Sequence, residues 1–251
     1  MTAAPKGSAV MEKRGLIPEK YKCLSDSVLK LLALISMLVD HAAVAFLRNG
    51  SPILLSIGSH TLTLYRAMRF FGRLAFPLYC FLLTEGFFHT RDRRRYALRL
   101  GIFAVLSELP WNLFRAGTLT CTDQNVFFTL LLGFLGIWAA EAFMAAERGR
   151  LKYAAALLGL LVMSLVLRGD YGAAGFGFIL MLWALRERPL VRAAVGCCLL
   201  PSQWKAGLAF IPIGLYNGER GFIRGRIAGL VFYAIYPLHL LAFALLRIHM
   251  T

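Results

Sequence analysis

Long apolar runs alternate with short polar or charged segments along the whole chain. The apolar runs cover residues 28–47, 66–89, 96–115, 126–146, 152–167, 172–185, 190–200, 205–216 and 227–248. The first five and the last have, or nearly have, the roughly 20 residues that a helix needs to cross a bilayer. The shorter runs between 172 and 216 are expected to be tilted, broken or re-entrant. The pattern predicts an all-α, polytopic helical bundle of about nine transmembrane helices, within a range of eight to ten.

The first 27 residues differ from the rest of the chain because they are polar. They contain no apolar stretch followed by a small-residue cleavage site, so we expect no removable signal peptide. We expect a polar cytoplasmic N-terminal segment over residues 1–27 and a single transmembrane domain over residues 28–251.

Composition supports a membrane protein. Hydrophobic residues make up 59% of the chain and charged residues only 16%, against about 45–50% and about 25% in soluble domains. This much apolar surface excludes an ordinary soluble enzyme.

The charged residues are strongly unbalanced, with 28 Lys and Arg against 13 Asp and Glu. A net charge of +15 is often a sign of nucleic-acid binding. Here, when the N-terminus is placed in the cytoplasm and the loops alternate, most basic residues fall on the cytoplasmic side, as the positive-inside rule requires. We therefore expect a lipid bilayer around the chain and no nucleic-acid partner.

Several common site motifs are missing from the sequence. The five cysteines have no C-x-x-C spacing, so neither a disulfide framework nor a metal site is expected. No phosphate-binding glycine loop and no G-x-S-x-G elbow is present.

The most informative polar residues lie inside the apolar runs. At about 1.5 Å of rise per residue, Asp40 and His41 lie about 18–20 Å above the inner end of their helix, and Glu108 and His239 lie about 18 Å above theirs. Asn112 lies about 24 Å above the inner end of the same helix as Glu108, and Arg73 lies about 10 Å below the outer end of its own helix. All four helices thus carry polar groups just outside the midplane of a core about 30 Å thick.

Two interpretations of this layer are open. Buried charges usually have partners, so the residues can simply hold the bundle together. Alternatively they form a functional site, because an apolar pair would stabilise a bundle as well as a buried ion pair. Arg69 and Arg73 share one helix face, and Arg73 has three candidate partners: Glu108, an oxyanion and a substrate carboxylate.

A histidine at this depth has a chemical use. Neutral imidazole takes a proton from an amine or hydroxyl as that group attacks a carbonyl. A nearby Arg or Asn stabilises the charge on the carbonyl oxygen. His41 and His239 are both candidates for the base, and His41 is favoured by its neighbour Asp40 and the arginine-rich helix.

Several motifs resemble one known family. They are Asp40-His41, Phe71-Gly72-Arg73-Leu74-Ala75-Phe76-Pro77, Glu85-Gly86-Phe87, Ser107-Glu108-Leu109-Pro110, Asn125, Asp170-Tyr171-Gly172 and Tyr236-Pro237-Leu238-His239. Together, over about residues 28–245, they resemble the TraX family, named for the conjugative pilin N-acetylation protein.

The resemblance implies an integral acetyltransferase of the bacterial inner membrane that uses acetyl-CoA. Such a protein is similar in plan to multi-pass membrane acyltransferases, including the heparan glucosaminide N-acetyltransferase type. The acceptor is then an unknown amine or hydroxyl of a peptide, glycan or small molecule. The resemblance carries over these residues: Asp40, His41, Arg73, Glu108, Asn125, Asp170 and His239.

Combining the residues with the resemblance gives a candidate site. The expected catalytic residues are His41, Asp40, Arg73, Glu108 and His239. The expected binding residues are Arg69, Asn112, Asn125 and Asp170. The alternative function is a multi-pass transporter or proton-coupled exchanger, because midplane Asp, Glu and His are also typical of transporters. A non-catalytic membrane scaffold is the third hypothesis.

Overall fold

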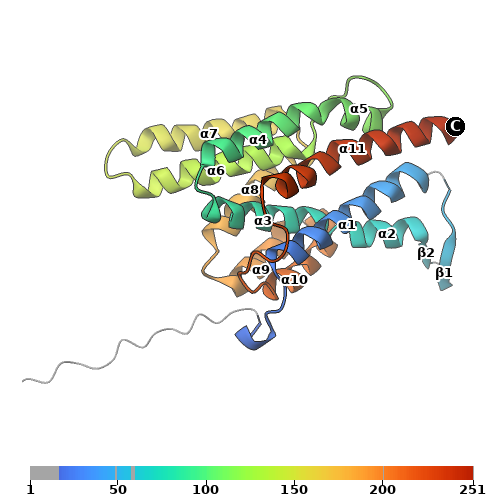
Figure 1. The fold of residues 1–251 in the computed structure, drawn as a ribbon, viewed down its shortest axis with the longest axis horizontal. Helices are drawn as coiled ribbons and strands as arrows, with labels where there is room; N and C mark the ends of the chain where they lie inside the picture. The colour runs from blue at the N-terminus through green and yellow to red at the C-terminus, as the bar shows by residue number, and fades with distance from the viewer. Residues whose placement is uncertain (1–16, 49, 58–59, 200, 251) are drawn as a thin grey trace, which may run out of the picture.

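The computed structural model describes residues 17–250 except 49, 58–59 and 200 (Figure 1). Most of the predicted N-terminal segment, residues 1–16, lies outside the described residues.

The helices are α1 (Asp26–Phe46), α2 (Leu64–Gly72), α3 (Ala75–His89), α4 (Arg93–Leu106), α5 (Glu108–Ala116), α6 (Val126–Ala145), α7 (Arg150–Val166), α8 (Gly172–Ala184), α9 (Pro189–Leu199), α10 (Phe210–Gly214) and α11 (Arg226–Met250). Short 3₁₀ helices cover Glu19–Tyr21 and Pro201–Ala209.

The helices form a bundle in which α6 and α1 are the main packing elements. α6 packs against α4, α7 and α8, and α1 packs against α2, α3 and α11. In Figure 1, α4, α6 and α7 lie on one side, α1 and α2 on the other, and α3 and α8 between them. Glycine allows the close approach of α6 to α8, because a Cβ at Gly136 would lie 2.7 Å from the Phe176 ring.

Fewer helices are long enough to cross a membrane than the sequence predicted. By length and composition, three described helices qualify: Asp26–Phe46, Val126–Ala145 and Ile227–Met250. A fourth span results if Arg93–Leu106 and Glu108–Ala116, bent by 43° at their junction, count as one. The mostly helical character and three to four candidate membrane helices are confirmed, whereas nine spans are not.

Two of the predicted continuous runs are broken. Run 66–89 divides at Arg73 and Leu74 into α2 and α3, and run 96–115 divides at Ser107 into α4 and α5. In each case a proline, Pro77 or Pro110, follows the break within the first turn of the next helix. Proline has no N–H and its ring clashes with the carbonyl four residues earlier, so it is favoured in the first turn of a helix and disfavoured in the interior. Pro237, inside α11, is an exception in this structure.

A β-hairpin, which the sequence analysis did not anticipate, separates α1 from α2. Its strands are β1 (Ile53–Ile57) and β2 (His60–Thr63), antiparallel with Ile53 opposite Thr63. The hairpin leads directly into α2, where the Thr63 side chain accepts a hydrogen bond from the Arg66 amide.

The segment between α10 and α11 is fastened to the start of α1. The Asp26 amide donates to the Glu219 carbonyl at 2.8 Å, and the Ser27 hydroxyl donates to the Arg220 carbonyl at 2.7 Å. Gly221 has φ of +74° and no room for a side chain, because a Cβ there would overlap Ser25 and Ser27. This close contact brings Arg220 beside the first turn of α1.

Candidate functional site

A long cavity of about 900 Å³ runs through the bundle between α1, α3 and α11. Its lining includes α1 residues from Asp26 to Val44, which are about 27 Å apart along a helix. A volume of this size is at the upper end of the roughly 300–1,000 Å³ typical of ligand sites. The cavity therefore connects the two ends of the bundle.

One end of the cavity is basic. Lys30, Arg91, Arg99 and Arg220 line it, from α1, the α3–α4 turn, α4 and the segment before α11. Lys30 is partly neutralised by Asp26, whose carboxylate accepts its hydrogen bond at 2.5 Å. Within the described part of the chain, the Nε of Arg99 is buried and has no hydrogen-bond partner. This end therefore has excess positive charge, as an anion site requires.

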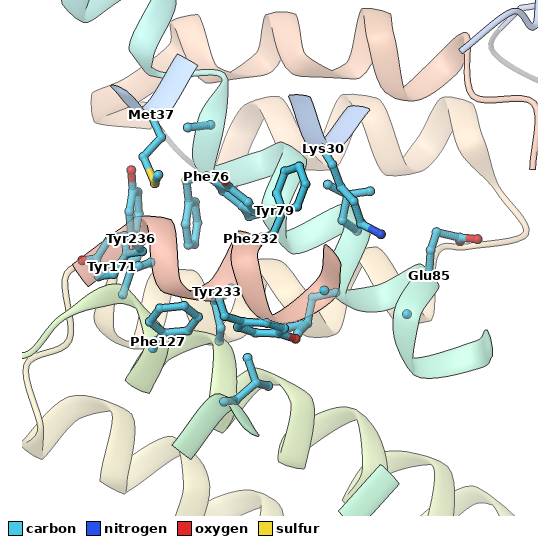
Figure 2. Close-up of a pocket in the computed structure, with 18 of the residues that line it drawn as sticks. Lys30, Met37, Phe76, Tyr79, Glu85, Phe127, Tyr171, Phe232, Tyr233 and Tyr236 are labelled. Atoms are coloured by element: carbon cyan, nitrogen blue, oxygen red, sulfur yellow. The ribbon is translucent and has the colours of Figure 1, made fainter. Parts of the chain in front are cut away.

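Aromatic side chains line the middle of the cavity. Figure 2 shows Phe76, Tyr79, Phe232 and Tyr233 between Lys30 at one side and Tyr236 at the other. Phe127 packs on Tyr233 with ring centroids 5.8 Å apart and on Tyr236 at 5.1 Å. The middle section is thus a largely apolar passage with a few hydroxyl groups.

The opposite end collects charges of both signs. Asp40, His41, Arg69, Arg73, Arg115 and Asp170 all line it. Asp40 and Arg69 form an ion pair, with side chains 15% and 23% exposed. A Cβ on Gly72 would overlap the Asp40 side chain, so the absence of a side chain at Gly72 lets α2 close onto α1.

Asp170 lies in the turn between α7 and α8, which is held against the start of α6. The Gln124 amide donates to the Arg168 carbonyl at 3.3 Å, and Arg168 itself has φ of +50°. The Asp170 side chain is exposed to the cavity but enclosed by protein on the other sides. This enclosure raises the pKa of Asp170 to about 6, against the opposing charge of Arg115.

His41 and His239 form a direct pair between α1 and α11. The Nδ1 of His41 and the Nε2 of His239 are 2.6 Å apart, and the two rings lie within 10° of parallel. The Nδ1 of His239 contacts the Ile235 carbonyl at 2.7 Å. His41 lines the cavity, whereas His239 is buried at 8% exposure.

Glu108, Asn112 and Asn125 form a separate cluster at the junction of α4, α5 and α6. The Glu108 carboxylate accepts hydrogen bonds from the amide and side chain of Asn125. Asn125 also donates to the Ala104 carbonyl at 2.8 Å and caps α6 through the Phe127 amide at 3.0 Å. Asn112 donates to the Leu119 carbonyl at 3.0 Å. We call Glu108, Asn112 and Asn125 the junction cluster.

The expected site residues thus divide into two groups. Asp40, His41, Arg69, Arg73 and Asp170 meet at the cavity, with His239 directly behind His41. The junction cluster is absent from the lining of that cavity. The expected pairing of Glu108 with Arg73 is replaced by the hydrogen bonds between Glu108 and Asn125.

Several cavity residues were not predicted from the sequence. Arg115 was not among the expected site residues, and the cavity tyrosines received no role. A usable signal was present, because Tyr79, Tyr96 and Tyr233 interrupt otherwise apolar runs, and a buried phenol normally needs a hydrogen-bond partner.

Comparisons with known proteins identify the family of the chain. The sequence model of the family described as "TraX protein" matches residues 25–247. A relative from Dichelobacter nodosus, "Probable fimbrial assembly protein FimC, serogroup H1", is 30% identical over 84% of this chain and 91% of its own length. No solved structure matches the chain. On the matched length of 25–247, the chain belongs to the TraX family.

Proposed function

We propose that the protein is a membrane acetyltransferase that moves an acetyl group from cytoplasmic acetyl-CoA to an amine or hydroxyl acceptor. The observation that carries the proposal is the continuous cavity, which joins a basic end to His41 and the charged end. We further propose a bacterial inner-membrane location with the N-terminus in the cytoplasm, because the basic loops are expected on that side.

The basic end suits the phosphates of CoA. Arg91, Arg99 and Arg220 supply guanidinium groups, which bind phosphate oxygens in pairs of parallel hydrogen bonds. The aromatic middle section would hold the flexible, mostly neutral pantetheine arm and bring the thioester to the far end.

The charged end suits acyl transfer. His41 would remove the proton of the acceptor as its nitrogen or oxygen forms a bond to the thioester carbonyl carbon. Arg73 would stabilise the negative charge on the carbonyl oxygen. The C–S bond then breaks, and the proton held by His41 passes to the CoA sulfur, so the products are acetylated acceptor and CoA.

The relative's name points to an acceptor. Because that protein is described as a fimbrial assembly protein, we propose a component of fimbrial assembly as the first acceptor class to test. Acceptors would enter at the charged end, where Asp170 offers a carboxylate to an ammonium group and Arg115 a cation to a carboxylate.

The experiment measures CoA release from acetyl-CoA by purified protein in lipid nanodiscs, with and without amine or hydroxyl acceptors. The expected result is acceptor-dependent release that falls about 10²–10⁴-fold in His41→Ala. His249→Ala is the matched control, because His249 is exposed near the end of α11. Equal release by His41→Ala and the wild type would contradict the proposal.

The same cavity keeps transport as a second candidate function. α1 residues from Asp26 to Val44 line the cavity, and a proton-coupled exchanger also needs a path of that length. Solute or proton flux into vesicles that needs no acetyl-CoA would favour transport and overturn the acetyltransferase.

A further inference from the structure

We propose that His239 is a positioning residue that fixes the proton of His41 on Nδ1, so that His41 accepts the substrate proton at Nε2. The inference rests on the proposed acetyl transfer and decides which of two histidines is the base. It follows from a chain of three groups: the Ile235 carbonyl, His239 and His41.

The carbonyl sets the direction of the chain. A backbone carbonyl oxygen only accepts hydrogen bonds, so the Nδ1 of His239 must carry a proton to bond with Ile235 at 2.7 Å. In neutral imidazole the other nitrogen is then an acceptor. The Nε2 of His239 therefore accepts, and the Nδ1 of His41, 2.6 Å away, donates.

This direction leaves one nitrogen available for chemistry. With its proton on Nδ1, neutral His41 has a lone pair on Nε2. Both nitrogens of His239 are already engaged, with Ile235 and with His41. Of these two histidines, His41 lines the cavity and His239 does not. Only His41 can therefore meet an acceptor that lies in the cavity.

The pair of histidines also stabilises His41 after it has taken up the substrate proton. When His41 gains a proton on Nε2, its Nδ1–H still donates to His239, and the bond becomes charge-assisted and stronger. The neighbour Asp40 does not take this role, because its carboxylate is paired with Arg69. Consecutive helix residues point about 100° apart, so Asp40 faces a different direction from His41.

Packing holds the two rings in place. The ring centroids of His41 and Phe114 are 5.2 Å apart, and those of His239 and Phe243 are 5.6 Å apart. Tyr236 lies edge-on to both histidines. These rings restrict rotation of either imidazole, which keeps the Nδ1–Nε2 contact aligned.

The direct test is nitrogen-15 NMR of histidine-labelled protein in nanodiscs, at a pH where the pair is neutral. The chain has five histidines, and single variants assign His41 and His239. We expect His41 to be protonated on Nδ1 in the wild type. In His239→Leu the proton should move toward Nε2, while in His239→Gln the amide oxygen should still accept and keep it on Nδ1.

Kinetics supply the second readout. His239→Leu should lower kcat roughly 10–100-fold and leave the KM for acetyl-CoA unchanged, a smaller loss than removal of the base itself. His239→Gln should recover part of that kcat, and no recovery is expected in His41→Gln. His249→Ala again serves as the control.

The two proposals fail in different ways. A wild-type His41 protonated on Nε2, or a His239→Leu variant with wild-type kcat, would overturn the positioning role. If the protein transfers no acetyl group but the NMR shows His41 protonated on Nδ1, the proposed function fails and the arrangement of protons stands.

Discussion

The charged end of the cavity and the Glu108–Asn125 pair of the junction cluster carry similar residues but differ in how those residues are satisfied. At the junction, Asn125 donates to the Glu108 carboxylate and to the Ala104 carbonyl and accepts from the Phe127 amide. The third member of the cluster, Asn112, keeps a buried Oδ1 that has no hydrogen-bond partner among the described residues. At the cavity, Arg73 and Asp170 face open space, and the Oδ1 of Asp40 is buried without a hydrogen-bond partner among the described residues.

The difference separates the Glu108–Asn125 pair, which we expect to be structural, from the polar residues that face the cavity. A buried polar group whose hydrogen bonds are all made within the chain stabilises one helix arrangement and has no capacity left for a ligand. A buried group with unused capacity costs stability and is expected where a substrate completes it. Substitutions of both kinds of residue test this division.

Arg73→Gln should give the largest effect. If Arg73 stabilises the carbonyl oxygen in the transition state, its loss should lower kcat about 10²–10³-fold, with little change in thermal unfolding. Arg66→Gln is the matched control from the adjoining helix α2, because Arg66 is exposed and absent from the cavity lining. Similar rates in the two variants would remove Arg73 from the site.

Asn125→Ala should act on stability instead. The substitution removes the N-cap of α6, which costs about 1 kcal/mol of stability. It also removes the hydrogen bond from the Asn125 side chain to the Glu108 carboxylate, which costs about 1–3 kcal/mol more. We expect a loss of about 2–4 kcal/mol in the free energy of unfolding, with kcat of the folded protein unchanged.

The measurement is denaturant or thermal unfolding in detergent together with the CoA-release assay. Asn217→Ala is the control, because Asn217 accepts from the Glu219 amide at 2.9 Å in an exposed loop. A large fall in kcat of folded Asn125→Ala would place the junction cluster in the functional site.

Gly72→Ala should have an intermediate effect on both properties. The added Cβ overlaps Asp40, so α2 must move away from α1, at a cost of about 1–3 kcal/mol, and the Asp40–Arg69 pair must shift. Gly159→Ala on α7 meets nothing within 4 Å and should instead raise stability by about 0.5–1 kcal/mol. Comparing the two unfolding midpoints checks the prediction, which is wrong if both shift in the same direction.

Asp170 should produce the smallest effect, visible as pH dependence. Its pKa of about 6 lies above the ordinary 3.8, so the folded state holds this proton more tightly than the unfolded state. Its contribution to stability is therefore full below about pH 4 and is lost as the pH rises through 6. If the carboxylate binds the acceptor, kcat/KM for an amine should rise through the same window. Asp170→Asn should flatten both curves, and unaltered curves would contradict the assignment.

Much of this arrangement follows from the sequence. Helical rise alone put Asp40, His41 and His239 at one depth, and the structure joins α1 and α11 at the two histidines. The apolar runs all contain helices, because apolar runs of this length satisfy their own backbone hydrogen bonds.

Other features of the fold and the site could not be predicted from the sequence, for physical reasons. Depth says nothing about rotation around the helix axis, so Glu108 was expected to meet Arg73 but meets Asn125. Hydropathy averages over many residues, which hides the breaks before Pro77 and Pro110. The contact between Ser27 and Arg220 joins residues 193 positions apart, and no local pattern encodes it.

A structure with a non-hydrolysable thioether analogue of acetyl-CoA would show whether the cavity binds the acyl donor. We predict phosphate density among Arg91, Arg99 and Arg220, the pantetheine arm beside Tyr79 and Tyr233, and the carbonyl next to His41. An analogue bound outside this cavity, or no bound analogue at saturating concentration, would contradict the account.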